Sequence, residues 1–184
     1  MEKKQIRDEI LAVRSALSDE ACMEKSAVIL KQLGRHDAYL SAYKVGLYAS
    51  YGREVITYPM IARSLMLDKG VSFPRILSAA ERKMEFRYIL RVSDLKPGYK
   101  GILEPGENAT IMQKPDLIVM PLVAFDPQRN RIGQGGGFYD AYLSEHPDIV
   151  KIALAYECQR VDMIPSEDFD VRPDIIITEE KIYE

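Results

Sequence analysis

The chain has 184 residues, of which 47% are hydrophobic and 29% are charged, and its formal net charge at pH 7 is −3. These values indicate one globular domain, residues 1–184, and argue against a protein that binds nucleic acid through a general positive charge. Two distant cysteines, Cys22 and Cys158, no apolar stretch of about 18 residues and no signal peptide predict a cytoplasmic protein that does not enter a membrane.

The first 33 residues show the spacing of two amphipathic helices. Apolar residues recur at helical intervals between charged ones from position 3 to 17: Ile6, Ile10, Val13 and Leu17. Ser18 is the expected N-cap of a second helix, which ends near Gly34. We expect the buried face of this second helix to carry four apolar side chains: Met23, Ala27, Leu30 and Leu33.

Residues 43–70 predict a strand, a loop and a helix in succession. The strand covers 43–49, the loop 50–57 and the helix about 58–69. Sheets of α/β proteins place ligands in the loops at the carboxyl ends of their strands, so the loop is a candidate site. Glu54 lies in it, but an acid there can equally complement the dipole of the following helix, and the residues alone favour that role.

The segment 71–106 alternates between strand and loop patterns. A short strand is expected at 71–74, and the alternation of Met84 and Phe86 with charged residues predicts a second strand at 83–90. Prolines and glycines are so frequent from 95 to 106 that we expect a loop there. Glu104 lies within it, and an acid in a loop is more often solvated than functional.

The central motif begins with an apolar run at 117–123, which predicts a strand buried on both faces. Four glycines follow within residues 133–137, and a helix is expected from 138 to 145. A strand, a glycine loop and a helix N-terminus together form an arrangement that binds phosphate, although a plain glycine-rich turn is the alternative. Arg131 and Asp140 favour the phosphate site, since one can pair with phosphate oxygens and the other can hold magnesium.

Two more apolar strands are expected near the C-terminus, at 151–156 and 174–178. Strands that alternate with helices along the chain predict a single three-layer α/β/α domain with a mostly parallel sheet.

Several of these segments resemble one known family. Pro121-Leu-Val-Ala-Phe-Asp126 and Arg131-Ile-Gly-Gln-Gly-Gly-Gly-Phe-Tyr-Asp140 closely resemble the signature of 5-formyltetrahydrofolate cyclo-ligases. Shorter similarities occur at Glu54-Val-x-Thr57, at Gly101-Ile-x-Glu-Pro105 and at Asp170-x-x-x-Asp174. The resemblance implies a sheet of the ribose-phosphate isomerase and CoA-transferase type.

The resemblance also implies a reaction. It is the ATP- and magnesium-dependent cyclisation of 5-formyltetrahydrofolate to 5,10-methenyltetrahydrofolate, with release of ADP and phosphate through a phosphorylated formyl intermediate. The implied partners are these small molecules, with no nucleic acid and no membrane, and the enzyme would act as a monomer.

The family's functional residues can be carried over to this chain by position. Arg131 and Asp140 would be catalytic. The implied ATP ligands are Lys3, Arg7, Arg131, Ile132, Gly133, Gln134, Gly135, Gly136, Gly137, Phe138 and Tyr139. The implied folate contacts are Tyr51, Glu54, Ile56 and Tyr139, although many relatives carry an acid where this chain has Ile56. Asp140 and Asp170 would hold Mg²⁺.

Two other functions are compatible with the same glycine loop. One is a domain that binds a phosphate ligand without hydrolysing ATP, and the other is a regulator that binds nucleotide without turnover. Neither needs a pair of acids around magnesium. Asp170→Asn would therefore be nearly silent in both cases and strongly damaging in a cyclo-ligase.

Overall fold

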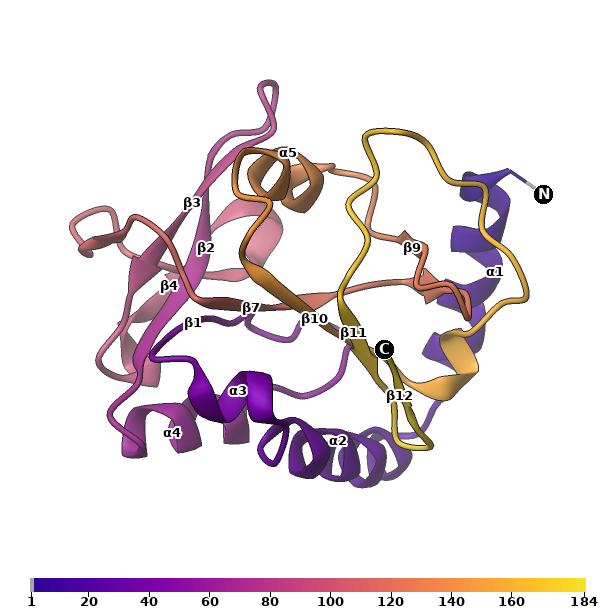
Figure 1. Cartoon of the computed structure of the whole chain (residues 1–184), viewed down its shortest axis with the longest axis horizontal. Helices are drawn as coiled ribbons and strands as arrows, with labels where there is room; N and C mark the ends of the chain where they lie inside the picture. Colours follow the sequence, from indigo (N-terminus) through magenta and orange to yellow (C-terminus); the bar gives the residue numbers. More distant parts are fainter. Residues whose placement is uncertain (1) are drawn as a thin grey trace.

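The apolar runs of the sequence form the middle of an eight-stranded sheet in the computed structural model, which describes residues 2–184 (Figure 1). Its strands, in chain order, are β1 (Lys44–Gly46), β2 (Gly70–Ser78), β3 (Lys83–Tyr88), β6 (Ile111–Met112), β7 (Leu117–Pro121), β10 (Val150–Leu154), β11 (Ile175–Ile177) and β12 (Ile182–Tyr183). Across the sheet the order is β12-β11-β10-β7-β1-β2-β3-β6.

The five central strands, β11, β10, β7, β1 and β2, run parallel to one another. Antiparallel strands are added at both edges, with β3 and β6 beyond β2 and β12 beyond β11. The sheet is therefore mostly parallel, as predicted. Parallel strands are buried on both faces because the helices that connect them cover the sheet, which explains why β7 and β11 are almost wholly apolar.

Helices cover the two faces of this sheet and make three layers. Helices α2 (Asp19–Leu33), α3 (Asp37–Ser41) and α4 (Tyr58–Met66) lie on one face, and α5 (Phe138–Glu145) lies on the other (Figure 1). Side chains of β7 alternate between the two layers, so Val119 packs toward α2–α4 while Met120 packs toward α5. The predicted three-layer α/β domain is confirmed.

Helix α1 (Lys3–Ser15) does not lie on the main sheet with α2–α4 (Figure 1). Its Ile6 and Ile10 pack against a small hairpin formed by β8 (Ala124–Phe125) and β9 (Arg131–Ile132). This separate apolar cluster holds the N-terminal helix beside the loop that follows β9. It therefore brings Lys3 and Arg7 to the glycine loop, although more than 100 residues separate them in the chain.

The buried faces of the first two helices differ from the prediction. Val13 is 46% exposed and Arg14 is buried instead, with its Nη1 donating to the carbonyl oxygen of Leu122 at 3.3 Å. In α2, Met23 and Ala27 are exposed. The inward positions are Cys22, Ser26, Ile29, Leu30 and Leu33.

The buried hydroxyl of Ser26 explains the different face of α2. It makes a 3.0 Å hydrogen bond with the hydroxyl of Tyr156 and accepts the N–H of Ile56. A polar side chain can be buried when its hydrogen bonds are satisfied, and apolar periodicity cannot reveal such a position. The predicted N-cap is confirmed, because the Ser18 side chain accepts the N–H of Ala21 at 3.1 Å.

The segment expected to be a loop at 95–106 contains a short hairpin. Strand β4 (Leu95–Pro97) pairs with β5 (Leu103–Pro105) around a 3₁₀ turn, η2 (Tyr99–Gly101). Prolines are tolerated because this is an isolated two-stranded ribbon, where many backbone positions need no donor. Two further 3₁₀ turns are η1 (Val92–Asp94) and η3 (Glu157–Gln159). Among residues 2–184, no helix is both long and apolar enough to cross a membrane.

Candidate functional site

A cavity of about 390 Å³ lies at the carboxyl ends of the central strands. Tyr48 and Ala49 line it just beyond β1, and Pro121 and Leu122 line it at the end of β7. Helix α1, the β2–β3 hairpin, the η2 turn and the glycine loop (residues 133–137) complete the wall. This is the edge of the sheet where α/β proteins bind ligands, because the loops there converge and the strands end.

The glycine loop enters α5 through backbone conformations that only glycine adopts easily. Gly135 has a φ of +91°, and Gly137, the N-cap of α5, has a φ of +67°. Gly136 between them leaves no room for a side chain, since a Cβ atom there would lie 2.7 Å from the ring of Phe138. The first N–H groups of α5 have no partner within the helix, so the loop and helix end can together receive an anion.

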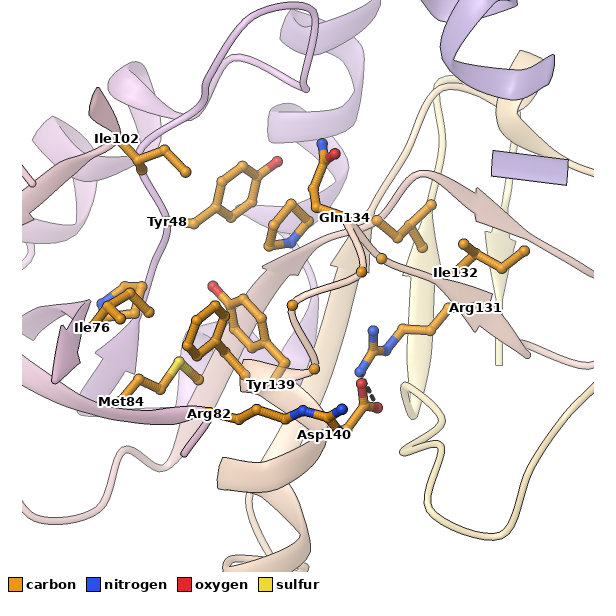
Figure 2. A pocket seen from close by; sticks show the side chains of 18 of the residues that line it. Tyr48, Ile76, Arg82, Met84, Ile102, Arg131, Ile132, Gln134, Tyr139 and Asp140 are labelled. Atoms are coloured by element: carbon orange, nitrogen blue, oxygen red, sulfur yellow. Dashed lines mark hydrogen bonds and ion pairs between the residues drawn. The ribbon is translucent and has the colours of Figure 1, made fainter. Parts of the chain in front are cut away.

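Arg131 and Asp140 form an ion pair at the end of the glycine loop (Figure 2). Arg131 Nη2 lies 2.6 Å from Asp140 Oδ1, and Arg131 Nε donates to the carbonyl oxygen of Val171 at 3.1 Å. The N–H of Val171 donates in turn to Asp140 Oδ1 at 3.0 Å. Burial lowers the pKa of Arg131, but the neighbouring carboxylate of Asp140 opposes this change, and the guanidinium stays charged at neutral pH.

A second ion pair closes the same side of the cavity. Lys3 Nζ lies 2.5 Å from Asp170 Oδ2 and 2.6 Å from Glu167 Oε2. Burial lowers the pKa of Lys3, but its hydrogen bonds and ion pairs with Asp170 and Glu167 together raise the pKa by more than burial lowers it. The pKa of Lys3 is therefore higher than its ordinary value. Each carboxylate expected to hold a metal is thus neutralised by a cation expected to bind phosphate.

The two predicted metal ligands lie at one end of the cavity. Asp170 directly precedes Val171, whose N–H is bonded to Asp140, and both acids line the cavity. In the part of the chain that the structure describes, no group of three or more His, Cys, Asp or Glu side chains is arranged to hold a metal. Two carboxylates nevertheless suit Mg²⁺, which commonly keeps water ligands and shares phosphate oxygens with its nucleotide.

Arg7 is fixed on the glycine loop. Its Nε donates to the carbonyl oxygen of Gly133 at 2.9 Å, and a Cβ atom at Gly135 would lie 3.8 Å from its guanidinium carbon. Ile132 is buried between this helix and the loop. Four predicted phosphate-binding elements therefore meet here: Lys3, Arg7, Arg131 and the glycine loop.

The other half of the cavity is largely apolar and aromatic. Figure 2 shows Ile76, Met84 and Ile102 gathered on the side away from Arg131 and Asp140. The rings of Phe138 and Tyr99 meet edge to face, with centroids 5.7 Å apart. Ile76 and Met84 come from the β2–β3 hairpin, Tyr99 and Ile102 from the η2 turn and the residue after it, and Phe138 from the start of α5. Sequence reasoning missed most of them, because alternation in a strand does not tell which face meets a ligand.

Two buried acids, Glu54 and Glu104, also line the cavity. Glu54 is 7% exposed, accepts the N–H of Tyr51 at 3.0 Å and lies 3.5 Å from the amide nitrogen of Gln134. Burial raises the pKa of Glu54, and the N–H of Tyr51 only partly offsets this. Burial likewise raises the pKa of Glu104, whose Oε1 accepts the N–H of Tyr99. Burial also raises the pKa of Tyr139, so its phenol is neutral at pH 7.

Two predicted folate contacts lie outside the lining of this cavity. Tyr51 is 55% exposed. Ile56 donates its N–H to Ser26 Oγ at 3.0 Å, and its side chain faces a separate shallow groove between α2 and α4. The structure gathers the other predicted site residues in one place: Lys3, Arg7, Glu54, Arg131, Ile132, Gly133, Gln134, Gly135, Gly136, Gly137, Phe138, Tyr139, Asp140 and Asp170.

Comparison with known proteins gives one consistent family. The model of the 5-formyltetrahydrofolate cyclo-ligase family matches residues 1–179. A 5-formyltetrahydrofolate cyclo-ligase of Haemophilus influenzae is 30% identical over 174 residues, which cover 92% of this chain and 93% of the relative. One of Escherichia coli K12 is 27% identical over 176 residues, 93% of this chain and 97% of the relative.

A solved structure has the same fold over nearly the whole chain. The NMR structure of Aquifex aeolicus 5,10-methenyltetrahydrofolate synthetase superposes with a TM-score of 0.87 at 27% identity. The match covers 99% of this chain and 92% of the other.

Proposed function

The chain belongs to the 5-formyltetrahydrofolate cyclo-ligase family, and we propose that it catalyses the ATP- and Mg²⁺-dependent cyclisation of 5-formyltetrahydrofolate to 5,10-methenyltetrahydrofolate. One observation carries the proposal, namely that a single cavity has a charged half around the glycine loop and an apolar half lined with aromatic rings. The charged half suits a nucleoside triphosphate, and the apolar half suits the rings of a reduced folate.

The chemistry requires activation of the formyl oxygen, which is a poor leaving group. Transfer of the γ-phosphoryl group of ATP to that oxygen releases ADP and gives an imino-phosphate on N5. N10 of the same folate then attacks the formyl carbon, the C–O bond breaks with departure of phosphate, and the proton of N10 passes to solvent. The protein's part in such a reaction is mainly to position both substrates and to neutralise charge.

The charged half supplies that neutralisation. We assign the triphosphate to the N–H groups of the glycine loop and to Arg131, with Lys3 and Arg7 closing over it from α1. Asp140 and Asp170 would hold the Mg²⁺, which supplies further neutralisation of the phosphate oxygens. The Arg131–Asp140 and Lys3–Asp170 pairs keep these side chains in place beforehand.

The apolar half would hold the folate. We assign Glu54 to the N–H groups of the pterin ring, because its carboxylate is buried in the cavity wall, and Tyr139 to contact with the ring system. Tyr51 and Ile56 lie outside the lining, so they receive no role in this assignment. We further propose that residues 1–184 act as one domain and as a cytoplasmic monomer. The two free cysteines, Cys22 and Cys158, fit a reducing compartment.

The test is a spectrophotometric assay of the purified protein. 5-Formyltetrahydrofolate, ATP and Mg²⁺ are supplied together, and the methenyl chromophore is followed, with ATP or Mg²⁺ omitted in the controls. Product that forms only when both are present supports the proposal. Folded protein that binds ATP yet forms no product would refute it and favour a nucleotide-binding regulator.

A further inference from the structure

The five cations that line the cavity differ in their partners. Arg131 and Lys3 are each paired with a carboxylate, and Lys100 lies over the ring of Tyr99. Two arginines, Arg7 and Arg82, have no carboxylate within 4 Å among the residues that the structure describes. Arg7 belongs to the nucleotide half, whereas neither the nucleotide nor the folate assignment uses Arg82.

Arg82 lies at the turn of the β2–β3 hairpin, with a left-handed backbone φ of +54°. Its side chain runs against the glycine loop, since a Cβ atom at Gly137 would lie 3.2 Å from Arg82 Cδ and 3.4 Å from Nη1. Figure 2 shows it extending beneath Tyr139 toward Asp140. The guanidinium therefore lies beside the N-terminus of α5, although the hairpin belongs to the opposite wall of the cavity.

The two unpaired arginines stand at the two ends of the glycine loop. From α1, Arg7 donates to the carbonyl oxygen of Gly133 and lies beside Gly135, and from the hairpin Arg82 lies beside Gly137. A guanidinium without a counter-ion beside a row of backbone N–H groups leaves a net positive charge where an anion can bind. The planar fork of arginine also matches the oxygens of a phosphoryl group in two places at once.

The position of the hairpin indicates which phosphate Arg82 meets. Met84, two residues after Arg82, and Ile76 on β2 line the apolar half assigned to the folate. The head of Arg82 reaches the α5 N-terminus in the nucleotide half. Arg82 thus spans the boundary between the two halves, and the group that must cross this boundary during the reaction is the γ-phosphoryl group.

We propose that Arg82 binds the γ-phosphoryl group of ATP from the folate side of the cavity and neutralises it as it passes to the formyl oxygen. This assignment rests on the proposed function and adds a catalytic residue to it. An arginine in this position acts on charge that is shared between the two substrates, as arginines do in other phosphoryl-transfer sites.

Nucleotide binding tests the proposal separately from turnover. Isothermal titration with Mg²⁺ and β,γ-imido-ATP should show roughly tenfold weaker binding to Arg82→Ala than to the wild type, the loss expected for a charged hydrogen bond. Binding of ADP should be unchanged, because ADP lacks the γ-phosphate. Arg82→Lys should recover part of the difference. Lys83→Ala, an exposed neighbour on the same hairpin, should match the wild type.

Turnover gives the second readout. We expect kcat to fall at least about tenfold in Arg82→Ala, in line with the effect of arginines that stabilise the transferred phosphoryl group in other enzymes. The KM for 5-formyltetrahydrofolate should stay the same. Equal losses for ADP and β,γ-imido-ATP, or a change in the folate KM alone, would overturn the γ-phosphoryl assignment. So would wild-type binding and turnover. A wild type without cyclo-ligase activity would refute the proposed function, while the two nucleotide titrations would still decide the role of Arg82 in binding.

Discussion

Arg131 Nη2 and Asp140 Oδ1 lie 2.6 Å apart, although the glycine loop separates the two residues by nine positions in the chain. Lys3 and Asp170 make an equivalent pair on the same side of the cavity. In both pairs a proposed phosphate ligand neutralises a proposed magnesium ligand. A nucleotide that arrives with its metal can therefore exchange partners with both pairs, so that no side chain is left with an uncompensated charge.

Arg131 should be the most sensitive single position of the site. Arg131→Ala removes the partner of Asp140 and the donor to the carbonyl oxygen of Val171. We expect kcat/KM for ATP to fall by about 100-fold or more, as when a transition-state donor is lost. Arg131→Lys should retain more activity but remain impaired, because a lysine lacks the second nitrogen of the fork.

Arg129→Ala is the matched control for this prediction. Its Nε donates to the carbonyl oxygen of Pro173, outside the cavity, so kcat/KM for ATP should stay close to the wild-type value. Equal losses in the two alanine variants would show that the effect of Arg131 is structural. Steady-state kinetics with varied ATP is the measurement.

Asp170→Asn should weaken the binding of magnesium. With one carboxylate less, we expect the Mg²⁺ concentration for half-maximal rate to rise about tenfold or more. The stability of the protein should change little, by about 1 kcal/mol or less, because the ion pair with Lys3 is partly exposed. Asp168→Asn, an exposed neighbour, should leave the magnesium titration unchanged. A wild-type titration in Asp170→Asn would remove Asp170 from the metal site.

Glu54 should make the stability of the ligand-free protein fall as the pH rises. Burial raises the pKa of Glu54 above its ordinary value of 4.5. Its stabilising contribution is therefore fully present below pH 4.5 and is lost as the pH rises through the folded-state pKa. Glu54→Gln cannot ionise, so the difference in unfolding free energy between the wild type and this variant should shift in favour of the variant over that interval.

Urea unfolding at a series of pH values measures the effect, and Glu24→Gln, on the exposed face of α2, is the control. A difference in unfolding free energy between the wild type and Glu54→Gln that stays constant with pH would contradict this prediction.

Glu54→Gln should also raise the KM for 5-formyltetrahydrofolate about tenfold, since an amide offers the pterin one acceptor in place of two. The KM for ATP should stay the same.

Gly136→Ala should disturb the folate half of the cavity. Its Cβ atom would lie 2.7 Å from the ring of Phe138, so the ring must leave its contact with Tyr99. We expect a higher KM for 5-formyltetrahydrofolate and a loss of about 1–3 kcal/mol in unfolding free energy, typical of overpacking. Gly106→Ala, where the added carbon meets no atom within 4 Å, should change neither quantity.

Local patterns predicted much of the fold. The helix at 138–145 has the predicted bounds, and the apolar runs mark β7, β10 and β11. These features depend on periodicity and on glycine punctuation, which act over a few residues. The motif from Arg131 to Asp140 likewise identified the loop and the two charged residues beside it, because its members lie within ten residues of one another, but the ion pair between these two residues was not predicted.

Features that depend on distant contacts could not be predicted. The buried face of α2 includes Ser26 because Tyr156, 130 residues away, satisfies its hydroxyl. The hairpin at 95–105 forms despite its prolines, and it places the Tyr99 ring against Phe138. Arg82 reaches the glycine loop from a hairpin turn whose sequence shows no motif. In each case the decisive partner is supplied by another element of the fold.

The contact between α1 and the C-terminal part of the chain has a consequence for biosynthesis. Lys3 meets Asp170, which follows it by 167 residues, and β11 enters the sheet only after that. A chain that is still emerging from the ribosome can pair β1, β2, β7 and β10 and form the glycine loop before it can complete the phosphate end of the cavity. A nascent chain therefore lacks the Lys3–Asp170 pair, and with it one of the two proposed magnesium ligands, until the segment that carries Asp170 has emerged.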